Sequence, residues 1–561
     1  MPLPSTDIHP RRRALVVAPP PTPNGDLHLG HLSGPYLRAD IYARALRMDG
    51  VDTLYITGID DHQSYVAMKG ERIGASPAET ADLFGQTITR TLAAARIEPD
   101  LIGFPRASPH HITLARTFLH RLHADGKLVL RDAPALFCET CDEFLFEAFV
   151  SGGCPHCGTP TGGNACEVCG RPNDCADLVA PQCNRCQAAP SVRSYPRLYF
   201  PLARHEERLR EYWSTVQMGP HLKSLIDRML AAGLPDVAVT HFSRWGIPAD
   251  LPGLEGQRIY VWFEMAAGHV AATRDVCEAQ GRVDGWEAFW KSPDTEIVEF
   301  MGFDNGYFYS VLFPAIYFAF DGGMRAPSAF ITNEFYRLEG LKFSTSRGHA
   351  VWGTEFLARI PADPVRFYLA YSGPETEQTD FTFAEFAASV RSELVRAWQG
   401  WLAELAVRIG SDAEGRAPAA EPRSREQQAF IDEIREVAGS ALAAYTAEAF
   451  SPQAVARALA ELVRRTRRFA ASQEHWRGID ARREERRAGI ALELAAAQTL
   501  ALLVAPLMPG FASALWRDLG NPGRIEDQRW ESLPALVPAG QPVALRGEYF
   551  EEPVDAAPAP G

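Results

Sequence analysis

The sequence predicts an α/β protein in which a cysteine-rich insertion splits a parallel-sheet domain and an all-α helical bundle follows. A strand–helix–strand pattern opens the chain, nine of ten cysteines fall between residues 138 and 186, and helical sequence prevails from about residue 380. The 561 residues are 46% hydrophobic and 22% charged, an ordinary globular composition that excludes fibrous and wholly disordered proteins. At about 100–200 residues per domain, three to five structural units are expected.

The first elements form a βαβ unit. Apolar residues 14–18 indicate a buried strand that ends at three prolines, and residues 29–47 carry apolar side chains at helical spacing. A second strand is expected at 53–57, parallel to the first. Helices are then predicted at 77–96 and 107–125, and further strands at 258–263, 296–301 and 329–333.

The C-terminal third of the sequence differs in character. Helical patterns at 383–409, 424–448, 452–473 and 485–506 are rich in Ala, Leu, Glu and Arg, which predicts a separate helical bundle. The last 25 or so residues are expected to form an extended tail.

Charge and cysteine usage limit the possible functions. The balance of 56 basic and 70 acidic residues gives −14, which argues against a protein that simply coats nucleic acid. The N-terminus lacks an apolar export signal and no run approaches 18 apolar residues, so we expect a soluble cytoplasmic protein without a membrane partner. In that compartment the cysteines predict metal binding rather than disulfides.

Four Cys-x-x-Cys pairs supply enough thiolates for two tetrahedral zinc sites. The pairs are Cys138 with Cys141, Cys154 with Cys157, Cys166 with Cys169, and Cys183 with Cys186. Because thiolates fill every position, a structural role is expected; a nucleic-acid-binding zinc ribbon is the competing interpretation. Cys175 is left over, and Cys277 is expected in the core.

Two histidines lie at the turn between the first strand and the first helix, in Pro21-Thr-Pro-Asn-Gly-Asp-Leu-His28-Leu-Gly30-His31. A helix N-terminus attracts phosphate, Gly30 lets the backbone approach a ligand, and imidazoles can donate to phosphate oxygens. Histidines at helix starts are often simple caps, but open α/β sheets bind ligands at such turns. The segment therefore predicts a phosphate-binding site.

A second candidate segment is Leu341-Lys342-Phe-Ser-Thr-Ser346. Such loops are common on surfaces, yet this lysine is one of only five in the chain, because 51 of the 56 basic residues are Arg. A lysine retained in so arginine-rich a chain suggests a need for a compact ammonium, which can neutralise charge on a transferring phosphate.

Together these segments resemble the two signatures of class I aminoacyl-tRNA synthetases, HIGH as His28-Leu-Gly-His31 and KMSKS as Lys342-Phe-Ser-Thr-Ser346. Three further blocks resemble the methionyl-tRNA synthetase family: Thr57-Gly-Ile-Asp60-Asp61-His62 its TGTDEHG, Tyr260-Val-Trp262-Phe-Glu264 its YVWLD, and Gly302-Phe-Asp304 its GKD. The resemblance runs from about residue 14 to 530.

The resemblance implies a Rossmann-like catalytic domain in two halves, 12–128 and 196–330, around a zinc-binding insertion at 129–195. It further implies a signature-loop and stem-contact region at 331–380, an anticodon-binding type of bundle at 381–530, and a tail at 531–561. In the family's pattern Cys154, Cys157, Cys166 and Cys169 share one zinc ion, and the outer pairs, Cys138 and Cys141 with Cys183 and Cys186, share another.

The activity implied is the ATP-dependent formation of an aminoacyl-adenylate, followed by transfer to tRNA, with Mg²⁺ and structural Zn²⁺ as cofactors. We expect a monomer. By position, ATP would contact Asn24, Gly25, His28, Gly30, His31 and Asp304, and its phosphates Lys342, Ser344, Thr345 and Ser346. The amino-acid pocket would comprise Pro20, Thr22, Asp60, Trp262, Met265, His269, Asn305 and Tyr309. Asp60 would hold the α-ammonium, and Trp262 would form a wall.

Several positions depart from the family's pattern. The second signature lysine is Thr345, which removes a cation of a kind worth about 3–4 kcal/mol in a transition state. The lysine of GKD is Phe303. In the pocket, Thr22, His269, Asn305 and Tyr309 replace Tyr, Tyr, Ile and His, and Met265-Ala266 replaces Ala-Pro. Polar groups left unpaired against a thioether are costly, so we expect a substrate other than methionine, or a different mode of binding.

The bundle carries arginines around an aromatic residue, which suits RNA. Arg464, Arg468 and Trp476 are the candidates, with a solvated charged face as the alternative. The positions with which the family reads the anticodon from its first bundle helix are Gly400 and Glu404 here. Two functional alternatives follow. One is a paralogue that activates another amino acid and passes it to tRNA or to a small-molecule or peptide acceptor in a specialised pathway. The other is a non-catalytic RNA-binding relative.

Overall fold

A six-stranded, fully parallel sheet forms the centre of the computed structural model, which describes residues 13–282, 285–343, 349–419, 421–422, 424–530 and 533–553. The strand order is β10-β15-β14-β1-β2-β3. The bounds are β1 (Arg13–Val17), β2 (Asp52–Gly58), β3 (Leu101–Gly103), β10 (Gln217–Met218), β14 (Thr295–Gly302) and β15 (Ala329–Asn333). The predicted pairing of the first two strands is confirmed, because β1 lies parallel to β2.

Helices cover both faces of this sheet, so its central strands are buried on both sides. Ala14 and Val16 of β1 face one core, and Leu15 and Val17 face the other. The connection from β1 to β2 comprises α1 (Leu29–His31), a π-helical turn over Leu32–Tyr36 and α2 (Leu37–Met48). The opposite face is covered by α5 (His111–Ala124), α8 (Val261–Ala279) and α10 (Phe313–Phe320).

The expected strand at 258–263 is wrong in its second half. Strand β13 (Gln257–Ile259) is followed by Tyr260 in extended conformation, and α8 begins at Val261. A short apolar run looks the same in a buried strand and in a buried helix, so periodicity alone could not separate them. The strands predicted at 296–301 and 329–333 and the helices at 77–96 and 107–125 are confirmed as β14, β15, α4 (Pro77–Ala94) and α5.

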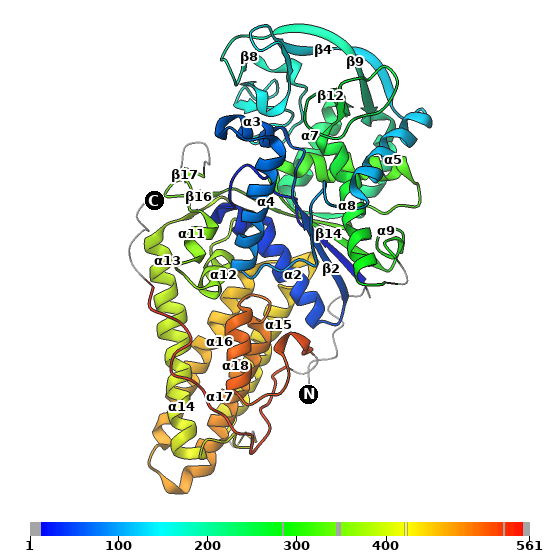
Figure 1. Ribbon diagram of the computed structural model, residues 1–561. Coiled ribbons are helices and arrows are strands. Elements are labelled where there is room, and N and C mark those ends of the chain that lie inside the picture. The colour runs from blue at the N-terminus through cyan, green and yellow to red at the C-terminus, as the bar shows by residue number, and fades with distance from the viewer. Residues whose placement is uncertain are drawn as a thin grey trace.

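The cysteine-rich insertion is a β-arm beside the central sheet, at the end of the molecule opposite the bundle tip (Figure 1). Its long strands β4 (Val129–Cys138) and β9 (Ser191–Pro201) pair antiparallel, with β5 (Glu143–Leu145) and β11 (Asp236–Ala238) at the two edges. A second small sheet contains β6 (Val150–Gly153), β7 (Pro160–Gly162) and β8 (Val179–Cys183). The apolar cluster of the insertion is small, which fits a region held together by metal.

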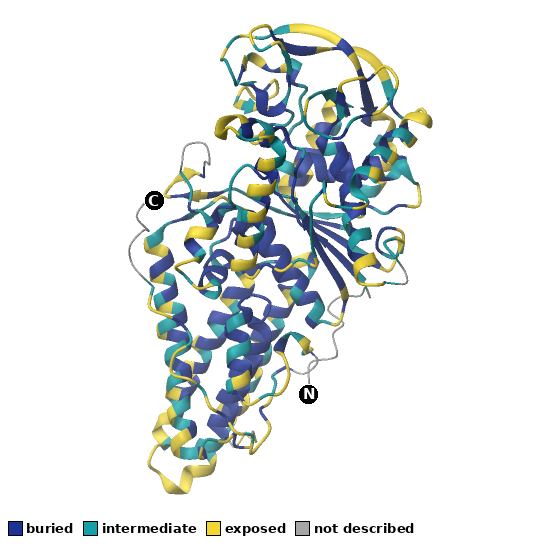
Figure 2. Cartoon of the chain, in the orientation of Figure 1, coloured by how far each residue is buried: buried dark blue, intermediate teal, exposed yellow. Residues whose placement is uncertain are grey.

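The predicted helical bundle is confirmed. Its elements are α13 (Phe383–Ser389), a π-helical stretch Val390–Gln399, α14 (Gly400–Ala413), α15 (Arg425–Ala443), α16 (Pro452–Gln473), α17 (Arg483–Val504) and α18 (Pro509–Asp518). Figure 2 shows buried residues along the bundle axis and exposed residues at its free tip. In the described part of the chain, one helical stretch, Asp480–Val504, is long and apolar enough to cross a membrane, but its apolar window is 94% buried as the centre of the bundle.

Residues 533–553, the described part of the predicted tail, contain no helix or named strand and pack against the bundle helices. Leu533, Val537, Val543 and Phe550 are buried in the same apolar cluster as the bundle. Phe550 lies 4.9 Å, between ring centroids, from Phe511 of α18.

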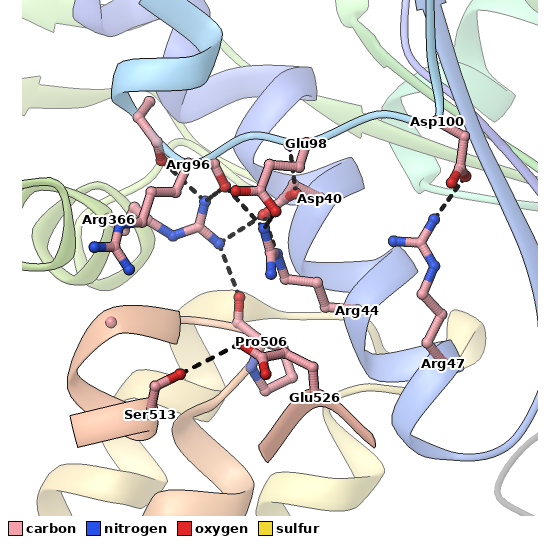
Figure 3. Close-up of polar contacts among 12 residues, drawn as sticks. Asp40, Arg44, Arg47, Arg96, Glu98, Asp100, Arg366, Pro506, Ser513 and Glu526 are labelled. Carbon is pink, nitrogen blue, oxygen red and sulfur yellow. Dashed lines mark hydrogen bonds and ion pairs between the residues drawn. The ribbon is translucent and has the colours of Figure 1, made fainter. Parts of the chain in front are cut away.

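One buried arginine joins the sheet domain to the bundle (Figure 3). Arg366, on α12 (Ala362–Tyr371), is 1% exposed and donates to Asp40 Oδ2 of α2 at 2.7 Å. It also donates to four backbone carbonyls, those of Ala95, Arg96, Pro506 and Leu507. Although burial raises the pKa of Asp40, the charges of Arg44 and Arg366 outweigh it, so the pKa is lowered.

Candidate active site and metal centres

The carboxyl ends of the parallel strands form the edge at which an open α/β sheet binds ligands. The loop after β1 ends at His28 and leads into α1, which contains His31; the loop after β2 contains Asp60, and the turn after β14 contains Asp304 and Asn305. Residues from three distant parts of the sequence therefore meet at one edge.

The two signature histidines cap the first helix reciprocally. His31 backbone N–H donates to His28 Nδ1 at 3.2 Å, and His28 backbone N–H donates to His31 Nδ1 at 3.3 Å. The rings stack with centroids 3.6 Å apart. Burial and the neighbouring His31 lower the pKa of His28 to about 2, and burial lowers that of His31 to about 4. Both rings are therefore neutral near pH 7, with Nδ1 accepting and the Nε2 proton left to donate to a ligand.

The second signature packs directly on the first. Phe343, which follows Lys342, stacks on His28 with centroids 4.6 Å apart. A Cβ at Gly30 would lie 3.1 Å from Phe343 and 3.0 Å from His28, so a larger residue here would crowd both rings of this stack. Lys342, at the end of β17 (Leu341–Lys342), forms an ion pair with Glu167 of the insertion. The predicted phosphate contacts Ser344, Thr345 and Ser346 lie outside the described residues.

Asp26 fixes the first signature loop, a role that sequence reasoning missed. Its Oδ1 accepts from Leu27 N–H at 2.7 Å and from the Thr91 hydroxyl at 2.5 Å. Its Oδ2 accepts from Thr354 N–H at 3.0 Å, in α11 (Gly353–Leu357). An Asp just before a helix start is a common cap, and that was the only available signal.

The predicted amino-acid pocket divides between two cavities. Pro20, Asp60, Met265 and His269 line a small cavity of about 40 Å³ between the ends of β1 and β2 and α8. Trp262, Asp304 and Asn305 line a second cleft of about 680 Å³, which is also lined by residues of the insertion. Tyr309 is fully buried, with its ring centroid 6.2 Å from that of Trp262. Thr22, Asn24 and Gly25 are half-buried in the loop after β1, and neither lining includes them.

Two buried carboxylates were not predicted as site residues: Glu264, which lines the smaller cavity, and Glu299, which lies beside His269. Glu264 Oε1 lies 2.7 Å from His62 Nδ1 and 2.8 Å from His111 Nε2. Burial alone would raise the pKa of Glu264, but these imidazoles lower it to about 2. Glu299 Oε1 lies 3.1 Å from His269 Nδ1. Burial, with Glu264 and Glu147, raises the pKa of Asp60.

The cysteines form two groups of four, with the pairing that the resemblance implied. In each group all Sγ atoms lie within 4.8 Å of one another, and the closest pairs are 3.4 to 3.9 Å apart. Tetrahedral zinc with Zn–S bonds of about 2.3 Å requires sulfurs about 3.8 Å apart, so both groups fit this ion. The ninth cysteine of the insertion, Cys175, is buried and belongs to neither group, and Cys277 lies in the core, as expected.

The candidate RNA-binding residues lie on the outer part of the bundle. Arg464 and Arg468 project from α16, and each forms an ion pair with Glu461. Trp476 follows that helix, half-buried at the bundle tip. Arg477 and Arg486 line a nearby cavity of about 310 Å³ with Glu404 of α14. The first bundle helix and the tryptophan segment therefore approach each other.

A parallel sheet with paired signature loops at its carboxyl edge, a zinc-knuckle insertion and a following helical bundle define a class I aminoacyl-tRNA synthetase. The chain belongs to the methionyl branch of this class: the family model described as tRNA synthetases class I (M) matches residues 14–405.

Named relatives extend over most of the chain. The methionine–tRNA ligase of Chlorobaculum tepidum is 32% identical over 95% of this chain and 76% of its own length. That of Korarchaeum cryptofilum is 32% identical over 92% of both chains. A crystal structure of Mycobacterium tuberculosis methionyl-tRNA synthetase with methionyl-adenylate superposes with a TM-score of 0.78 at 16% identity, over 96% of this chain and 99% of that one. That superposition supports the fold.

Proposed function

We propose that this protein activates an amino acid with ATP as an aminoacyl-adenylate and transfers the aminoacyl group to tRNA. The main structural support is the stack of His28 on Phe343, which holds both signatures at the carboxyl edge of one sheet. Methionine is the amino acid in the names of the relatives, so it is the first to assay.

The chemistry follows from placing charge and donors around the phosphates. A carboxylate oxygen of the amino acid forms a bond to the α-phosphorus of ATP, while the bond from that phosphorus to the pyrophosphate oxygen breaks. The neutral imidazoles donate from Nε2 to phosphate oxygens, and Lys342 neutralises charge on the leaving pyrophosphate. Asp60 lines the smaller cavity, where it would hold the α-ammonium. Mg²⁺ would enter bound to ATP and share its phosphate charge.

Both cysteine groups would hold structural Zn²⁺. The insertion has only a small apolar cluster of its own, so metal coordination would supply much of its folding free energy. With zinc bound, its loops would keep Glu167 and Asn164 in place along the wall of the larger cleft.

The bundle would hold tRNA through its tip. Arg464, Arg468 and Trp476 would contact RNA there, and basic residues beside an aromatic suit unpaired bases. Glu404 places a negative charge at the predicted anticodon-reading position, so we do not expect the family's usual readout there. A cytoplasmic monomer remains our expectation.

Pyrophosphate exchange and tRNA charging test this function separately. Lys342→Ala is expected to lower kcat/KM for ATP in the exchange reaction about 100-fold or more, because it removes a transition-state contact of roughly 3–4 kcal/mol. Lys223→Ala, at an exposed lysine of α7 (Pro220–Ala232), is the matched control. Absence of exchange with every amino acid would contradict activation, and exchange without charging of total tRNA would contradict the tRNA step.

A second candidate is a paralogue that adenylates an amino acid other than methionine. The observation that favours it is that two further polar side chains, Glu264 and His269, are among the residues that line the cavity of about 40 Å³. A methionine side chain offers these groups no hydrogen bond.

A further inference from the structure

The loop that carries Asp60 has no regular secondary structure of its own. Residues 59–62 lie between β2 and α3 (Ser64–Ile73), so contacts with other segments set the position of this loop. Asp60 N–H donates to the Pro21 carbonyl at 3.0 Å, which ties the loop to the segment after β1. A second anchor is His62, two residues further along the chain.

Glu264 joins this loop to two helices through a single oxygen. Its Oε1 lies 2.7 Å from His62 Nδ1 and 2.8 Å from His111 Nε2. Glu264 lies in the first turn of α8, two residues after Trp262, and His111 is the first residue of α5. The side chains of His62 and Glu264 are 6% and 3% exposed, so little water competes for these contacts.

The contacts involve an ionised carboxylate. Burial alone would raise the pKa of Glu264, but the two imidazoles lower it to about 2. Burial lowers the pKa of His62, yet the charge of Glu264 outweighs burial, so the pKa is raised. Hydrogen bonds to an ionised group are roughly twice as strong as those between neutral groups. The cluster is therefore a strong joint between the loop and α8.

His111 also lies directly on the backbone of α8. A Cβ at Gly268 would lie 2.7 Å from His111 Cε1, so a larger residue there would displace the ring. Asp60, His111, Glu264 and Gly268 all line the small cavity. The cluster therefore borders the place where Asp60 would hold the α-ammonium.

The two carboxylates of this cavity have different surroundings. Glu264 contacts two imidazoles, whereas Asp60 is influenced by other carboxylates: burial, and then the charges of Glu264 and Glu147, raise its pKa. An ammonium group beside Asp60 would relieve that repulsion. The imidazoles thus occupy Glu264 and leave Asp60 as the carboxylate for the amino acid.

We propose that Glu264 is a positioning residue for amino-acid binding: it holds His62 and His111 on one oxygen and so fixes the Asp60 loop against the helix that carries Trp262. The inference rests on the proposed adenylation and concerns how the same site binds its amino acid. His62 and His111 are positioning residues of the same cluster.

Pyrophosphate exchange tests the proposal, with the full zinc-loaded chain and the amino acid that the parent protein activates best. Glu264→Leu removes both contacts and should raise KM for the amino acid about 10- to 100-fold, because a misplacement of about 1 Å can cost 100-fold. KM for ATP should change less than about twofold. Glu264→Gln, whose oxygen can still accept from both rings, should stay within about fivefold of the parent.

Glu493→Leu is the matched control. Glu493 is 2% exposed, as Glu264 is, and it accepts from Trp401 Nε1 at 3.0 Å and from Arg408 within the bundle. Its loss should leave both KM values of the exchange reaction unchanged, even where it lowers stability. Equal changes in the two KM values of Glu264→Leu, or no change in either, would refute the positioning role.

His62 tests the cluster from the other side and keeps the proposal testable if Glu264→Leu does not fold. His62→Ala should raise KM for the amino acid at least fivefold. His62→Asn, whose amide can donate from near the position of Nδ1, should restore most of the loss. An Asn variant as impaired as the Ala variant, or an Ala variant that matches the parent, would overturn the proposal.

The double variant of His62→Ala with Glu264→Leu should have a KM for the amino acid within about twofold of Glu264→Leu alone, because residues that share one contact are not additive. Effects that multiply would show that the two residues act independently and would overturn the inference. No exchange by the parent with any amino acid would contradict adenylation itself, and this inference with it, whereas an unchanged KM in Glu264→Leu would overturn this inference alone.

Discussion

Arg366→Met is expected to destabilise the junction between the sheet domain and the bundle. The guanidinium is 1% exposed, and the variant would remove one ion pair, to Asp40 at 2.7 Å, and hydrogen bonds to four carbonyls. Asp40 would keep Arg44 at 2.9 Å and Glu98 N–H at 3.0 Å, so its own charge stays partly compensated. Removing one partner of a buried pair costs about 3–5 kcal/mol, and the unpaired carbonyls place this variant in that range.

The measurement is urea unfolding followed by tryptophan fluorescence and circular dichroism. The first transition is the relevant one, because several domains rarely unfold in a single step. Arg464→Met is the matched control, since its pair with Glu461 is exposed and such pairs are worth about 0–1 kcal/mol. A loss below about 1 kcal/mol in Arg366→Met, similar to the control, would refute the view that this arginine ties the two domains together.

Three further predictions concern the signature loops and the insertion. Glu167 pairs with Lys342 and would compete with ATP for its ammonium group. Because such an exposed ion pair is worth about 0–1 kcal/mol, Glu167→Gln should lower KM for ATP in pyrophosphate exchange by up to about fivefold. A higher KM in this variant would contradict that competition. Metal analysis should find two zinc ions per chain, one after Cys154→Ser and still two after Cys277→Ser, whereas an equal loss in both variants would contradict the assigned groups. Folding lowers the pKa of His28 from 6.5 to about 2, so below pH 6.5 the ring becomes protonated in the unfolded chain and stays neutral in the folded chain. The free energy of unfolding of the parent protein therefore falls as the pH falls below 6.5. The unfolding free energy of His28→Asn relative to the parent should therefore rise by up to about 2 kcal/mol from pH 6.5 to 5, and a fall would contradict the burial of a neutral ring.

Local sequence patterns predicted much of the architecture. The βαβ unit, the bundle helices and the four Cys-x-x-Cys pairs were predictable, because apolar periodicity, caps and ligand spacing act over a few residues to a few turns. The grouping of those pairs into two sites came from the resemblance to the family. The apolar residues at 258–263 were misassigned in part for the same reason, since a fully buried helix and a fully buried strand share that pattern.

Which polar side chains contact one another at the candidate site depended on tertiary structure. Sequence reasoning predicted His269, Asp60 and Lys342 as site residues, but not Glu264, whose contacts with His62 and His111 span 202 and 153 positions. The pairing of Lys342 with Glu167 likewise spans 175 positions. Motifs determine which residue types meet at the strand ends, whereas the packing of distant segments decides which charges are buried together. Burial removes water from these charged groups, so their pKa values depend strongly on the partners buried with them. Only the folded chain brings those partners into contact.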